Sequence, residues 1–169
     1  MTEPKVFLGS KREQESVQPL FAHAAWRVLV VPAVLFIVVG GVDSLLTWFP
    51  ASFGQAEWEF GTITASLNGL PLPVLGLVLL MAAAMSANSL IGVRVVAALL
   101  VLTALVVLVM AVFYLLTVPH ALRAASAAGG VTALGLKKAM IKTAVQLVAY
   151  PVGLLSSAWI GWRYTKGIE

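Results

Sequence analysis

One carboxylate lies inside a long apolar stretch, and it is the strongest candidate for an ion pair or a proton-binding group. Asp43 is the only acid between Arg27 and Phe49. A carboxylate at membrane depth costs several kcal/mol unless it is paired, protonated or within reach of water.

Along a helix, Asp43 lies roughly 24 Å from Arg27. Lys142, in the last apolar stretch, lies roughly 31 Å from Arg163, and a lysine stem can bridge the difference. We therefore predict an Asp43–Lys142 ion pair. The alternatives are an Asp43 that reaches headgroups or water, and a proton or ion site.

The two histidines could bind haem or a bacteriochlorophyll through a ring nitrogen. His23 precedes the first apolar stretch and His120 follows the third, so a membrane would separate them. This separation excludes ligation of one group by both histidines. A single pigment contact from His23 stays an alternative to the ordinary case, an interfacial histidine bonded to water or backbone. We predict no cofactor, and we expect bound lipids.

Small residues recur at every fourth position of the last apolar stretch and would share one helix face. They are Ala149, Gly153, Ser157 and Gly161. Such a stripe allows another helix to approach closely. Gly40 and Ser44 form a shorter version in the first stretch. We predict that both are helix-packing faces, within the bundle or against a partner, with a transport hinge as the alternative for the longer one.

The sequence contains none of the familiar enzyme motifs. Cysteine is absent, which excludes disulfides and thiolate metal sites. Phosphate-binding glycine loops, His-x-x-x-His spacing and a nucleophile beside a base are also absent. Only Glu57 and Glu59, on either side of Trp58, could serve an enzyme that acts on lipid headgroups. We predict that the protein is not an enzyme and has no metal site.

The elements that must position these residues follow from composition. Of 169 residues, 60% are hydrophobic and 11% charged, with a mean hydropathy of +0.98, which excludes a water-soluble fold. A membrane span needs about 20 apolar residues. Barrel strands would alternate polar and apolar positions, whereas the apolar stretches here have no such alternation. We predict an all-α integral membrane protein with four transmembrane helices in an antiparallel bundle (27–169), after a polar tail (1–26) at the membrane surface. The spans are predicted near 28–49, 70–88, 95–118 and 139–162.

Basic and aromatic residues indicate the orientation. Of the eleven Lys and Arg residues, seven fall on the side of the two termini and four on the opposite side. This bias predicts that both termini are cytoplasmic, in a bacterial inner membrane. Because the basic residues lie at the ends of apolar stretches, we expect no nucleic-acid partner. Tryptophans favour the interface, and the predicted anchors are Trp26, Trp159 and Trp162 at one level and Trp48 and Trp58 at the other.

One short region resembles a known family. Ala56-Glu57-Trp58-Glu59-Phe60, followed by Leu70-Pro71-Leu72-Pro73-Val74-Leu75-Gly76-Leu77, is similar to the outer link and second-span start of small bacterial membrane proteins associated with hormogonium polysaccharide secretion. The resemblance implies a small multi-span accessory protein, and it carries no catalytic residues.

Together these features predict a non-catalytic accessory or structural subunit of a larger bacterial membrane complex, for example an energy-converting or photosynthetic one. Its partners would be other integral membrane subunits and membrane lipids, contacted through helix faces. The alternative is a small transporter or channel that acts as a homo-oligomer. That function would require Asp43, Gln146 or Asn88 to line water.

Overall fold

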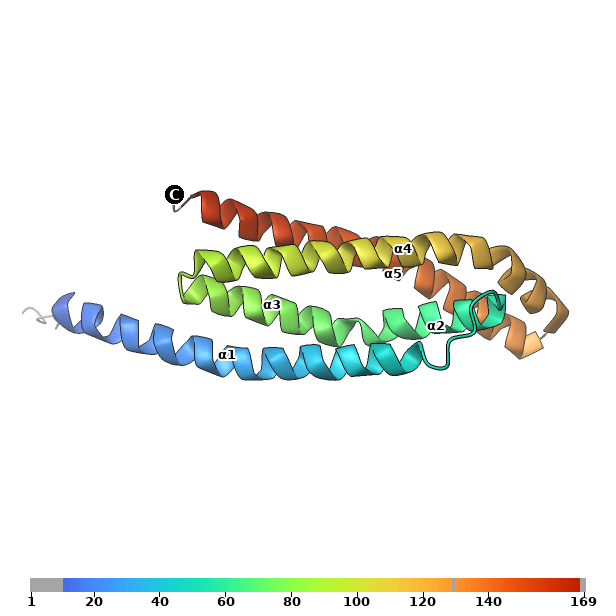
Figure 1. Cartoon of the computed structure of the whole chain (residues 1–169), viewed down its shortest axis with the longest axis horizontal. Coiled ribbons are helices and arrows are strands. Elements are labelled where there is room, and N and C mark those ends of the chain that lie inside the picture. Colours follow the sequence, from blue (N-terminus) through green and yellow to red (C-terminus); the bar gives the residue numbers. More distant parts are fainter. Residues whose placement is uncertain (1–10, 129, 168–169) are drawn as a thin grey trace, which may run out of the picture.

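The computed structural model describes residues 11–128 and 130–167, without the side chains of residues 11–25, 27, 128 and 132, and its regular structure is helical (Figure 1). The helices are α1 (Lys11–Thr47), α2 (Ala56–Gly69), α3 (Pro71–Ser86), α4 (Leu90–Ala128) and α5 (Gly130–Lys166). Four segments in this part of the chain are long and apolar enough to cross a membrane: Val28–Thr47, Ala56–Ser86, Leu90–Ala127 and Ala133–Lys166. The predicted all-helical class with four membrane-length segments is confirmed.

The second of these segments is a discontinuous helix. It combines α2 and α3, which are separated by a turn at Leu70. Pro71 and Pro73 have no amide hydrogen, so the helical hydrogen bonds to the carbonyls of Leu67 and Gly69 cannot form. The Leu70 amide still bonds to Ser66, at 3.0 Å. The prolines thus end α2 and begin α3, where their fixed φ is favourable.

The helical structure extends beyond the predicted spans. The second span was predicted to start at Leu70, whereas α2 already begins at Ala56. Residues 119–138 were predicted to link the last two spans, but they continue α4 and begin α5. With 39 and 37 residues, these helices are longer than the about 20 residues that a crossing needs. The added residues lie where α4 ends and α5 begins. Near that end α4 curves, where Pro119 removes an amide hydrogen (Figure 1).

Helix α4 contributes to two groups of buried side chains, one along each half of the helix. At one end, α3 and α5 pack against its first half through Leu77, Met81 and Leu154. At the other end, α2 and α5 pack against its second half through Phe60, Ile63, Leu67, Met140 and Leu147. The Tyr114 hydroxyl of α4 donates a 2.7 Å hydrogen bond to the carbonyl of Met140. The α4–α5 contact is the most extensive in the fold.

Helix α1 is peripheral and packs mainly against α3. It also touches α2, and its described residues do not contact α4 or α5. Two glycines bring α1 and α3 close together. A Cβ at Gly40 would overlap the Pro73 ring, and one at Gly76 would lie 2.6 Å from the carbonyl oxygen of Ala33 and 2.7 Å from Ile37. The predicted packing role of Gly40 agrees with this geometry, and Gly76 is its counterpart on α3.

We predict that Gly76→Ala destabilises the protein by about 1–3 kcal/mol, because the new methyl group would force the α1 backbone away from α3. The measurement is unfolding of the purified protein in detergent. Gly41→Ala is the matched control, since a Cβ at Gly41 meets no atom within 4 Å. If the two variants unfold alike, the close α1–α3 contact is not formed.

Candidate functional site

An ordered aromatic segment joins α1 to α2. The ring of Trp58 lies edge-on to those of Trp48 and Phe53, with centroids 5.9 and 5.3 Å away. Trp48 donates its indole hydrogen to Ser66 of α2 at 3.0 Å, and the Gly54 amide donates to Glu59 at 2.9 Å. The segment therefore fixes the start of α2 against the end of α1. Glu59, one of the two acids considered for headgroup chemistry, has a structural hydrogen bond here.

A layer of polar side chains connects α2 to α5. The hydroxyls of Thr64 and Thr143 lie 3.2 Å apart, and Gln146 donates to Asn68 at 3.4 Å. The side-chain oxygen of Gln146, Oε1, is buried and has no hydrogen-bond partner in the structure. Gln146 was among the polar residues considered from the sequence, whereas Asn68 was predicted to lie in a link outside the membrane. The four-residue spacing of Thr64 and Asn68 is the signal that would have placed both on one helix face.

Asp43 lies beside the break between α2 and α3. A Cβ at Gly69 would lie 2.7 Å from a carboxylate oxygen of Asp43, so the absence of a side chain there makes room for the acid. The carboxylate thus lies beside the last residue of α2.

The structure does not form the predicted Asp43–Lys142 pair. Both side chains are exposed, and no salt bridge joins these two described residues. Helix α1 does not contact α5, because α2 and α3 lie between them (Figure 1). Similar depth along two helices does not make the helices neighbours.

The predicted small-residue stripe on α5 divides into two parts. Gly161 is buried, and a Cβ there would lie 2.6 Å from Met81 of α3. Ala149 and Gly153 are exposed, and a side chain at Gly153 would meet no atom within 4 Å. With Ser157, which is half-buried, they border a groove of about 170 Å³ between α5 and the residues Val74 and Val78 of α3. Ser44, in the shorter stripe, is half-buried on α1.

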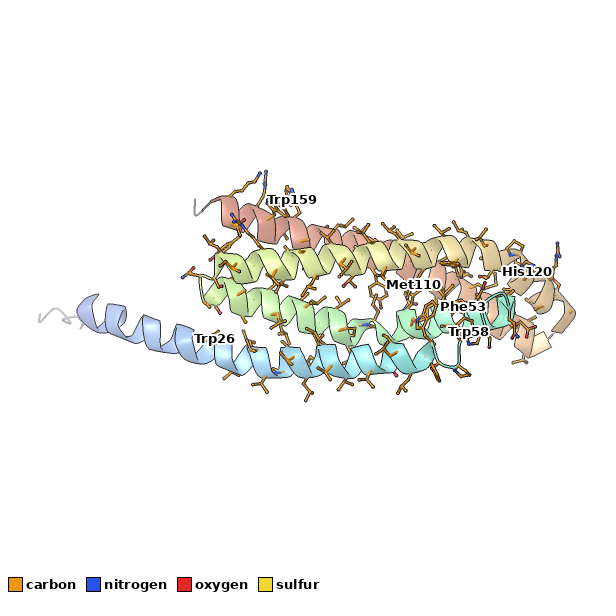
Figure 2. All side chains as sticks on the ribbon, viewed as in Figure 1. Trp26, Phe53, Trp58, Met110, His120 and Trp159 are labelled. Carbon is orange, nitrogen blue, oxygen red and sulfur yellow. The ribbon has the colours of Figure 1, made fainter. Side chains whose placement is uncertain are left out.

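The predicted anchors gather at the two ends of the bundle. Figure 2 shows Trp26 and Trp159 toward one end and Trp58, with Phe53, toward the other. Trp159 and Trp162 are more than half exposed, and the Arg163 guanidinium lies 4.3 Å from the Trp159 ring centre. Near the same end, the Tyr164 hydroxyl bonds to Asn88 at 2.9 Å and to the Met85 carbonyl at 3.2 Å. Asn88 thus ties α5 to the turn between α3 and α4.

A cavity lies at the opposite end, where α2 begins. Its volume is about 670 Å³. Its lining combines polar and apolar side chains from α4, α5 and the start of α2: Gln55, Ala56, Glu57, Phe60, His120, Ala121, Arg123, Ala124 and Leu136. Glu57 and His120 were not predicted from the sequence to lie near each other. They are 63 positions apart in the chain, and only packing of α2 against α4 makes them neighbours of one cavity.

The residues considered for cofactors do not form one group. His120 is exposed at the cavity, whereas the side chain of His23 lies outside the described part of α1. Among the side chains that the structure describes, no three His, Asp or Glu residues are grouped as a metal ion would require. Comparison of the chain with family models, with curated proteins and with solved structures finds no match. The arguments about function therefore come from this chain's own residues.

We predict that Asp43→Asn and Lys142→Met change the stability additively, because the two side chains do not interact. Their coupling energy in a double-mutant cycle should be within about 0.5 kcal/mol of zero. Asn68→Ala and Gln146→Ala provide the comparison, since their hydrogen bond should give a coupling of about 0.6 kcal/mol. Unfolding in detergent measures both cycles. A strong coupling between Asp43 and Lys142 would show that the two side chains form an ion pair after all.

Proposed function

We propose that this chain is a non-catalytic accessory subunit of a larger bacterial membrane complex, for example an energy-converting or photosynthetic one. In this proposal its four spans form an antiparallel bundle in the inner membrane, with both termini in the cytoplasm. Its partners are other integral membrane subunits and membrane lipids, and it needs no cofactor. The observation that carries the proposal is the face of α1 that points away from α3.

This outer face of α1 is a regular aliphatic seam. Its residues alternate spacings of three and four: Val28, Val31, Leu35, Val38, Val42 and Leu45. All six are exposed, by 70% at Val31 and 74% at Leu45. Spacings of three and four place side chains on one stripe that faces a partner helix. The opposite stripe, which faces α3, contains the small residues Ala33 and Gly40. Helix α1 therefore packs on α3 through a close glycine contact and has bulkier side chains on its outer face.

A second place for a neighbour lies beside α5. The groove next to Ala149 and Gly153 is open, and small residues allow close helix approach. The charges at the termini support binding to the membrane surface. The C-terminal end of α5 carries Arg163 and Lys166, which would contact anionic headgroups if the orientation is as proposed.

Site-specific photo-crosslinking in native membranes tests this proposal. A photoreactive residue at Leu35 or Val38 should give a discrete adduct with a different protein, because that seam faces the partner. Val109 of α4 is the matched control, because its side chain is as exposed as the two on α1. The exposed fraction is 56% at Val109, 56% at Val38 and 57% at Leu35. We expect no discrete protein adduct there. Lipid adducts alone at all three positions, or equal protein adducts at all three, would contradict the proposal.

A small transporter or channel formed by several copies of the chain is the second candidate. It is favoured by the break at Leu70, because irregular backbone at membrane depth is tolerated where it lines a cavity or is covered by protein. The buried, unpartnered oxygen of Gln146 and the Asp43 carboxylate lie on the two sides of α2 and α3 near this break.

Thiol labelling separates the two candidates, because the natural chain has no cysteine. We predict that Asn68→Cys and Gln146→Cys stay unreactive toward a membrane-impermeant reagent applied from either side. The exposed end of α4, at Arg123→Cys, is the positive control. Rapid labelling at position 68 or 146, together with cross-linking between two differently tagged copies, would favour the transporter or channel.

A further inference from the structure

The end cavity between α2, α4 and α5 is the strongest remaining candidate for a binding site. Its volume of about 670 Å³ is within the usual range for pockets that bind small molecules. Three separate helices line it, so its shape depends on the packed bundle and not on one loop. The floor includes Phe60 and Ala121, which are buried members of the α2–α4–α5 core.

The polar side chains at this cavity carry charges of both signs. Four exposed side chains in its lining are polar: Gln55, Glu57, His120 and Arg123. Within the described part of the chain, none of these four side chains has a hydrogen-bond or ion-pair partner. They are therefore available to a ligand. A purely anionic ligand would be repelled by Glu57, and a purely cationic one by Arg123.

The aromatic residues at this end of the bundle indicate that the cavity lies at the outer edge of the lipid headgroup layer. Phe53 and Trp58 mark the aromatic level at this end of the bundle, and Figure 2 shows His120 on the outer side of both. His120 follows Phe113, on α4, by seven residues, which corresponds to about 10 Å along a helix. The headgroup layer extends about 5–8 Å beyond the hydrocarbon on each side. An amphiphile anchored in the bilayer could place its polar end in this cavity.

We propose that this cavity binds a zwitterionic phospholipid whose phosphodiester is followed by a primary ammonium, as in a phosphoethanolamine headgroup. Arg123 binds the phosphate, since a guanidinium matches two phosphate oxygens at once. His120 and Gln55 add hydrogen bonds. The Glu57 carboxylate accepts a hydrogen bond from the primary ammonium. A quaternary choline group cannot make this bond, because it has no N–H to donate. Phe60 and Ala121 face the glycerol and the upper acyl carbons.

Native mass spectrometry of the full chain in detergent tests this site. Phosphoethanolamine, phosphocholine and phosphoglycerol lipids with identical acyl chains are offered at equal concentration. We expect preferential retention of the phosphoethanolamine lipid. Arg123→Ala should weaken it by about tenfold, the effect of losing one charge-assisted contact. Glu57→Gln should remove the preference over phosphocholine while phosphate binding persists.

Two controls make the result specific. Lys138→Ala removes an exposed positive charge near Leu136 at the same end but outside the cavity lining, and it should leave lipid retention unchanged. Ala124→Trp, which fills the cavity, should abolish retention without changing a charge. Each variant is first shown to unfold like the natural protein.

Three results would overturn the proposal. One is equal retention by the natural chain and by the Arg123→Ala and Ala124→Trp variants. Another is a preference for phosphoglycerol lipid that Glu57→Gln does not alter. The third is full displacement of the lipid by water-soluble glycerophosphoethanolamine at equal concentration. That result would assign the same headgroup chemistry to a soluble ligand, not to a lipid.

Discussion

The apolar layer of a membrane supplies no water to the backbone, so each amide hydrogen and carbonyl must find its partner within the protein. This constraint accounts for the helical structure of the described chain, and it also makes the break at Leu70 conspicuous. Pro71 and Pro73 prevent two helical hydrogen bonds near Gly69. The neighbouring polar groups, Ser66 with Trp48 and the carboxylate of Asp43, gather at this point. The break thus concentrates the polar interactions that connect α1 to α2 and α3.

Packing in such a layer depends on close contact, because lipid is as apolar as the side chains that it touches. The structure meets this requirement in two ways. Helices α1 and α3 approach through Gly40 and Gly76, where no side chain separates the backbones. Helices α4 and α5 pack along a large area and add the Tyr114–Met140 hydrogen bond. The remaining aliphatic surface, above all the seam on α1, is free for lipid or for another helix, and we propose a helix of a partner subunit.

Hydropathy was enough to predict the helical class and four membrane-length segments, because a span of about 20 apolar residues is a strong signal. It did not reveal α2 as part of a span. Thr62, Thr64, Ser66 and Asn68 lower the hydropathy there, yet in the fold two of them are buried and the other two are hydrogen-bonded to α5. The Asp43–Lys142 pair was wrong for a different reason. Depth can be estimated from one helix, whereas adjacency depends on the order of helices around the bundle. The end cavity was missed for the same reason, since Glu57 and His120 become neighbours only when α2 packs on α4.

We propose that the chain works as a docking subunit within a larger assembly. The most direct measurement is the mass and composition of the particle that contains this chain when native membranes are extracted with a disc-forming polymer, without detergent. We expect a particle in which this 17.8 kDa chain accompanies different integral membrane proteins in a fixed ratio. A particle that contains only this chain, as a monomer or as several copies, would contradict it.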